Sequence, residues 1–69
     1  MRKNCKDLII QVSSIEYLTG IPLDLFYYCG AWRVVDTNGY EIISAGTITE
    51  MYKQLSAVLT FLAMPYIRL

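Results

Sequence analysis

The sequence predicts a small α+β domain with the order helix, short helix, β-hairpin and C-terminal helix, the last helix packed on the hairpin. Three observations predict this class. A capped run of apolar residues at helical spacing opens the chain, two β-rich runs joined through Asn38-Gly39 follow, and a second capped helical pattern comes after them. The sequence contains no internal repeat or linker composition, so residues 1–69 are expected to form one domain.

The first helix is expected to begin after Asn4, which can cap it together with Asp7 three residues later. Gly20 fits its end. Another interpretation stays open, in which residues 8–13 form a short strand and a helix starts at Ser14, because β-branched residues are dense there. The helical interpretation rests on one row of apolar residues, Leu8, Val12, Ile15 and Leu18.

A short second helix is predicted from Pro22 to Tyr28. Proline suits the first turn of a helix because its ring fixes φ and its missing N–H is not needed there. Gly30 then closes the segment.

The clearest local signal is a β-hairpin between Trp32 and Ser44. A two-residue turn would set Asp36 opposite Glu41, whereas a three-residue loop with a left-handed Gly39 pairs Asp36 with Tyr40. Like charges that face each other are unfavourable, so the three-residue loop is favoured. One face of the hairpin then carries Trp32, Val34, Tyr40 and Ile42, with Val34 opposite Ile42.

The last helix is predicted from the capping pair Thr47 and Glu50, three residues apart, through Met51 to about Ala63, with Pro65 ending it. A row of apolar residues at helical spacing is typical of a helix that packs on a core. That row consists of Ile48, Met51, Tyr52, Leu55, Val58, Leu59 and Leu62.

Two groups of side chains are candidates for contact with a partner. Phe61 and Met64 lie on the side of the last helix that faces away from the apolar row. Among the aromatic residues ahead of the hairpin, we expect Phe26 and Trp32 to lie in the core and Tyr27 or Tyr28 to lie outside, since tyrosine is a common interface anchor. The predicted partner-binding residues are therefore Tyr27, Tyr28, Phe61 and Met64.

The charge balance, the apolar runs and the cysteine content argue against nucleic-acid binding, secretion and membrane insertion. The chain has 6 Lys+Arg, 6 Asp+Glu and no histidine, so it has no basic footprint for nucleic acid and little net charge to oppose self-association. Its apolar runs are too short for a secretory signal or a membrane span, which predicts a cytoplasmic protein without a membrane partner. Cys5 and Cys29 are then expected to be reduced thiols.

The residue types for most site chemistry are missing. Without histidine there is no Ser-His or Cys-His pair, and two cysteines cannot complete a zinc site, which needs about four ligands. The stretch from Asp36 to Gly39 lacks the later glutamate of a calcium loop, and no phosphate-binding glycine motif is present. We therefore expect no enzyme activity and no cofactor. Binding of a small molecule between hairpin and helix is left open, through Trp32, Tyr40 or Tyr52.

Residues 14–28, SIEYLTGIPLDLFYY, together with Asn38-Gly39-Tyr40, give one resemblance. They resemble the helix-turn-helix opening and the wing motif of the MerR and excisionase winged-helix regulators, which implies DNA binding. Phe26 and Glu41 stand where that family carries arginines, so the groups that neutralise phosphates are missing. On this alternative, DNA contacts would come from Arg2, Lys3, Lys6 and Arg33.

The function that the sequence favours is a non-enzymatic interaction protein, expected to be a homodimer that binds another macromolecule and modulates or inhibits it. The small size, the missing catalytic groups and the 55% hydrophobic residues are typical of compact regulators encoded by phages or mobile elements. The winged-helix DNA-binding regulator is the alternative. If the interaction hypothesis holds, Phe61→Asp is expected to abolish association without unfolding the chain.

Overall fold

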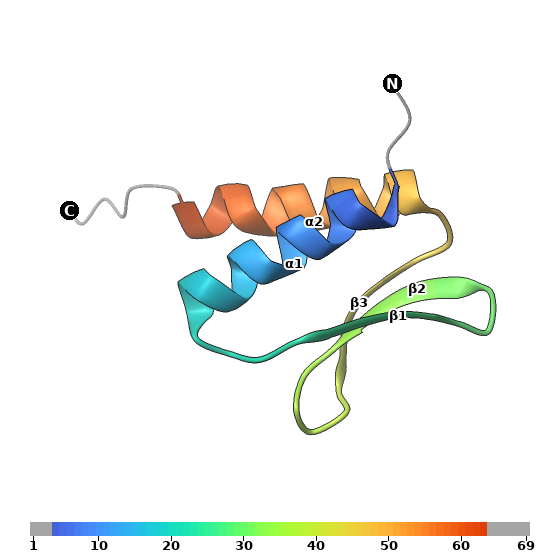
Figure 1. Ribbon diagram of the computed structural model, residues 1–69, viewed down its shortest axis with the longest axis horizontal. Coiled ribbons are helices and arrows are strands. Elements are labelled where there is room, and N and C mark those ends of the chain that lie inside the picture. Colours follow the sequence, from blue (N-terminus) through green and yellow to red (C-terminus); the bar gives the residue numbers. More distant parts are fainter. Residues whose placement is uncertain (1–3, 64–69) are drawn as a thin grey trace.

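The computed structural model describes residues 4–63, which fold into two helices and a three-stranded antiparallel sheet. This confirms the predicted α+β class. The sheet has the order β1-β2-β3, and both helices lie on the same side of it (Figure 1). The elements are α1 (Cys5–Thr19), β1 (Asp24–Tyr28), β2 (Ala31–Val35), β3 (Glu41–Ala45) and α2 (Ile48–Ala63).

The two helices are packed side by side and run in the same direction, with both N-terminal ends at the right of Figure 1. In the sequence, all three strands lie between the two helices. The amide of Gln11 in α1 donates a hydrogen bond to the hydroxyl of Ser56 in α2, at 2.7 Å. This bond joins the two helices directly.

Helix α1 confirms the helical interpretation of residues 8–13 and removes the strand alternative. Its first turn is closed by a reciprocal cap, in which the Asn4 side chain accepts from the backbone N–H of Lys6 and Asp7, and the Asp7 carboxylate accepts from the N–H of Asn4 at 2.8 Å. Gly20 ends the helix in the left-handed conformation that glycine adopts without strain. Caps at both ends outweigh the β preference of the isoleucines and valine between them.

The predicted short helix from Pro22 to Tyr28 is wrong, because this segment contains the strand β1. Its turn to β2 consists of Cys29 and Gly30, with φ of 52° and 77°, and a two-residue hairpin turn of type I′ needs positive φ at both positions. Pairing Leu25 with Val34 makes β2 the central strand. A helix in place of β1 would leave one edge of β2 unpaired.

The loop between β2 and β3 has the favoured three-residue form. Asp36 N–H donates to the Tyr40 carbonyl at 3.0 Å, Gly39 has a φ of 83°, and the Asp36 carboxylate accepts from the N–H groups of Asn38 and Tyr40. The Asp36 carboxylate therefore stabilises the loop by accepting two backbone hydrogen bonds within it.

The predicted pairing of Val34 with Ile42 is wrong. Val35 pairs with Glu41 and Val34 pairs with Ile43, so Ile42 is an extra residue in a β-bulge. The predicted hairpin face is therefore also wrong, because Val34 is buried while Tyr40 and Ile42, expected beside it, are exposed.

Helix α2 begins directly after Thr47, whose hydroxyl accepts from the backbone N–H of Glu50 at 3.1 Å. The hydroxyl half of the predicted cap is thereby confirmed. The structure describes the helix through Ala63, and Pro65, predicted to end it, lies outside the described residues. The core lies between the two helices and the sheet, and Trp32 packs against it as expected. Its buried residues are Leu8, Val12, Ile15, Val34, Ala45, Met51 and Leu55.

The β1–β2 turn gives a first prediction. Cys29 holds a positive φ, which costs a non-glycine residue about 1–2 kcal/mol, and asparagine tolerates it better. Cys29→Asn is expected to raise the free energy of unfolding by about 0.5–1 kcal/mol in urea titrations. Cys5→Ser, at the other exposed cysteine, is the control and is expected to leave stability unchanged. A less stable Cys29→Asn variant would contradict this account of the turn.

Candidate functional site

Tyr27 and Tyr28 are both exposed, as predicted. They lie on β1, an edge strand of the sheet, and the Tyr27 ring meets the Trp32 ring edge to face with centroids 5.3 Å apart. The expectation that Phe26 lies in the core is wrong, since its side chain is 39% exposed. In a strand, neighbouring side chains point to opposite faces, so Phe26 lies on the face opposite to Tyr27 and to Leu25, which packs against the core.

Phe61 is 74% exposed near the end of α2, as predicted. Met64 lies outside the described residues. The β1–β2 turn and the C-terminal end of α2 are at opposite ends of the molecule in Figure 1, so the structure does not bring Tyr28 and Phe61 together. The predicted partner-binding residues therefore do not form one surface, since Phe61 lies apart from β1, and Tyr27 and Tyr28, as neighbours in a strand, point to opposite faces of the sheet.

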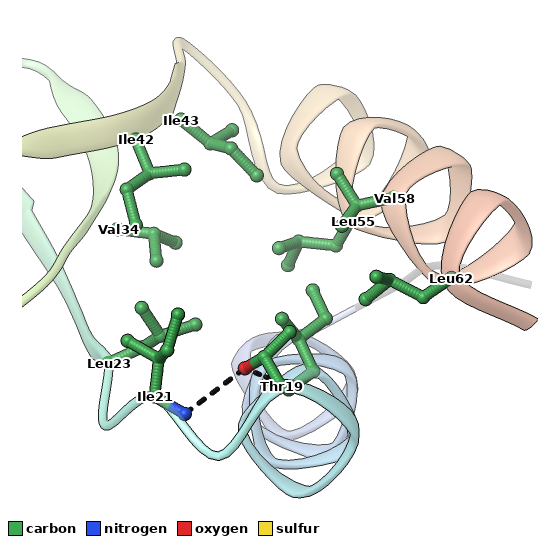
Figure 2. Close-up of a pocket in the computed structure, with 10 residues that line it drawn as sticks. Thr19, Ile21, Leu23, Val34, Ile42, Ile43, Leu55, Val58 and Leu62 are labelled. Atoms are coloured by element: carbon green, nitrogen blue, oxygen red, sulfur yellow. Dashed lines mark hydrogen bonds between the residues drawn. The ribbon is translucent and has the colours of Figure 1, made fainter.

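Between α2 and the sheet lies an apolar pocket of about 220 Å³, which we call the α2 pocket. Figure 2 shows side chains from the 20–23 loop and the strands facing those of α2 across it. Its walls come from both helices, the loop after α1, β2 and β3. The lining residues are Ile15, Thr19, Ile21, Leu23, Val34, Ile42, Ile43, Leu55, Val58 and Leu62.

The α2 pocket has a buried floor and an exposed rim. Ile15, Val34 and Leu55 form the floor, while the rim residues Ile21, Ile42 and Leu62 are open to solvent. Thr19 is the polar exception among the lining residues, and its hydroxyl is occupied because it donates to the Ile15 carbonyl at 2.8 Å and accepts from the Ile21 N–H at 3.2 Å. The lining therefore favours an apolar group and offers little to a polar one.

The β-bulge helps to build this pocket. In a regular strand Ile42 and Ile43 would point to opposite faces of the sheet, yet both line the pocket. The extra residue re-aims one of the two side chains toward α2. Sequence reasoning missed the pocket, although two adjacent isoleucines just after an Asn-Gly loop are a signal that one face receives more apolar residues than alternation allows.

A second exposed apolar surface, also missed from the sequence, covers the side of α1 that faces away from the core. We call it the α1 outer face. Its large side chains are exposed, and the small residues between them leave a shallow hollow. It consists of Ile9, Ile10, Ser13, Ser14, Tyr17 and Leu18.

The residues assigned to DNA on the alternative hypothesis do not form a basic patch in the described part. Arg33 forms an ion pair with Glu41, and its Nε donates to the Tyr28 carbonyl at 3.0 Å. Lys6 is exposed in the first turn of α1, and Arg2 and Lys3 lie outside the described residues. The second helix that a helix-turn-helix requires is replaced by β1.

Among residues 4–63, both cysteines are free and exposed, and His, Cys, Asp and Glu side chains form no cluster that could hold a metal ion. The described helices are too short or too polar to cross a membrane. The α2 pocket lies between the hairpin and α2, but Trp32, Tyr40 and Tyr52, the residues that the sequence suggests for a small ligand, are not among its lining residues.

Comparison of the chain with protein-family models, with curated proteins and with solved structures finds no match.

The α2 pocket gives a second prediction. Val58→Phe places an aromatic ring into the empty volume, and filling a cavity stabilises a protein by about 0.5–2 kcal/mol. Valine and phenylalanine have similar helix propensities, so the helix itself is unaffected. Thr60→Phe, an exposed position two residues further, is the matched control and is expected to leave the melting temperature unchanged. Equal shifts in the two variants would mean that the pocket is not open space.

Proposed function

We propose that this chain is a non-enzymatic interaction protein, a homodimer that binds another protein by accepting one of its large apolar side chains in the α2 pocket, and that modulates this partner by occupying its surface. The observation that carries the proposal is the open, apolar pocket itself. Protein interfaces are dominated by a few aromatic or aliphatic anchors that fill such pockets.

The size of the pocket fits this use. An apolar cavity of about 150 Å³ accepts benzene in an engineered protein, so a volume near 220 Å³ suits one large aliphatic or aromatic side chain. The exposed rim residues Ile21, Ile42 and Leu62 would contact the segment on either side of the anchor. Phe61 does not line the pocket, but it is the exposed neighbour of the rim residue Leu62 in α2, so a bound segment that passes over Leu62 can reach it.

Peptide selection tests the proposal without knowledge of the partner. A displayed library of short random peptides is selected against the full chain, and the enriched peptides are expected to share a leucine, phenylalanine or tryptophan. Val58→Phe should weaken their binding about 10- to 100-fold, which corresponds to the burial of one large apolar side chain. Thr60→Phe should bind like the wild type.

Two results would overturn the proposal: no enrichment above background, or selected peptides that bind Val58→Phe as tightly as the wild type. A parallel measurement with Tyr28→Asp distinguishes the α2 pocket from the β1 end of the molecule. Binding that depends on Tyr28 and not on Val58 would move the partner site to the β1 end of the molecule.

The rim gives a third prediction. Phe61→Asp places a charge next to the rim residue Leu62 in α2, and the large exposure of Phe61 means that the core is not disturbed. The selected peptides are expected to lose affinity, while the circular dichroism spectrum and the melting temperature stay at their wild-type values. Unfolding of this variant would show that Phe61 serves packing and not contact with a partner.

A further inference from the structure

The α1 outer face is an apolar surface on a helix whose other side already packs on the core. Between Asp7 and Glu16 the helix carries no charged residue, and Glu16 is engaged because its carboxylate accepts from the Leu23 N–H at 2.7 Å. A single surface helix has no need of a second apolar side. The exposed fractions are 53% for Ile9, 64% for Ile10, 88% for Tyr17 and 51% for Leu18.

The centre of this face has the form of a knobs-into-holes socket. Ile10, Ser13, Ser14 and Tyr17 occupy the relative positions of four neighbours on a helix surface, and the hollow lies among them. The order of sizes along the helix is large, small, small, large, so it reads the same from either end. A twofold symmetric interface requires a patch that is complementary to itself, and a reversible pattern has this property.

We infer that the α1 outer face binds the same face of a second copy of this chain, with the two α1 helices antiparallel and crossing at the serines. Ile10 of one copy packs on Tyr17 of the other, and the reverse contact follows from the symmetry. Small side chains at the crossing allow the helices to approach closely. This inference rests on the homodimer part of the proposed function and gives it an interface.

The available area agrees with a dimer of modest strength. From the exposed fractions, the large side chains of the face provide on the order of 500 Å² per chain, or about 1,000 Å² for the pair. That reaches the lower limit for a specific interface. A formal net charge of zero leaves little electrostatic repulsion between two copies.

A membrane surface fits the α1 outer face less well than a second copy. Helices that lie on membranes carry several lysines or arginines beside the apolar side, and α1 has Lys6 alone between Cys5 and Thr19. The hollow at the serines also has no use against lipid, whereas a facing helix fills it.

Light scattering of the full chain over about 5–200 µM, a range that suits an interface of this size, is the first test. The mass of the wild type is expected to rise from 7.9 kDa toward twice that value. Tyr17→Glu is expected to remain at the mass of one chain. Tyr40→Glu, at another largely exposed tyrosine in the hairpin loop, is expected to associate like the wild type. Circular dichroism confirms that each variant is folded.

Disulfide trapping tests the orientation, in a chain that also carries Cys5→Ser and Cys29→Asn. With an added thiol oxidant such as diamide, Ser13→Cys is expected to form a covalent dimer because two copies of this position meet near the twofold axis. Lys6→Cys is expected not to, since antiparallel helices place its two copies about 20 Å apart, beyond the reach of a disulfide.

Three results from light scattering would overturn this inference: a wild type that stays at the mass of one chain, a mass beyond two chains, or a Tyr17→Glu variant that still associates. Disulfide trapping through Lys6→Cys would also overturn it, because it indicates parallel helices. Peptide binding in the α2 pocket is measured independently. If the chain is a monomer that still binds the selected peptides, the proposed dimer is wrong and the proposed partner site stands. If it is a dimer that binds no peptide, the partner site is wrong and the dimer stands.

Discussion

The rest of the fold depends on one buried cluster, which consists of Leu8 from α1, Val34 from β2, and Met51 and Leu55 from α2. These are the largest fully buried side chains of the described residues, and together they join both helices to the central strand. Because so short a chain buries little surface, a modest number of such contacts must hold three elements at once. Loss of any one of them opens a cavity that the small core cannot close by relaxation.

The position of this contact also explains where the exposed surfaces lie. The buried residues of α2 are Met51 and Leu55, both in its first half, so the last turns of the helix are less tightly covered by the sheet. The α2 pocket opens beside those turns, where Val58 and Leu62 contribute to its walls. On α1 the buried residues form a single row, which leaves the opposite side of the helix uncovered. Apolar residues that the core cannot accommodate are thus gathered at two defined places.

Local chemistry was enough to predict both helices and the loop at Asn38-Gly39, because their caps and the left-handed glycine act within a few residues. The strand β1 was not predictable in the same way. Pro22 suggests a helix locally, and the segment becomes a strand because β2 needs a neighbour and the Cys29-Gly30 turn supplies one. The bulge at Ile42 and the pocket depend on packing between elements that are distant in sequence. The spacing of apolar residues along the chain carries no information about such packing.

The parallel run of the two helices has an electrostatic consequence. Asp7 and Glu50 in the first turns complement the positive ends of the two helix dipoles, but neither last turn contains a basic residue. Thr19 ends α1 and Leu62 lies in the last turn of α2, and both line the α2 pocket. The negative end of α1, which Gly20 caps, therefore lies beside the pocket, and it favours a cation over an anion there by about 0.3–1 kcal/mol. The pocket is apolar within, and the dipole of α1 makes negative charge unfavourable beside Thr19.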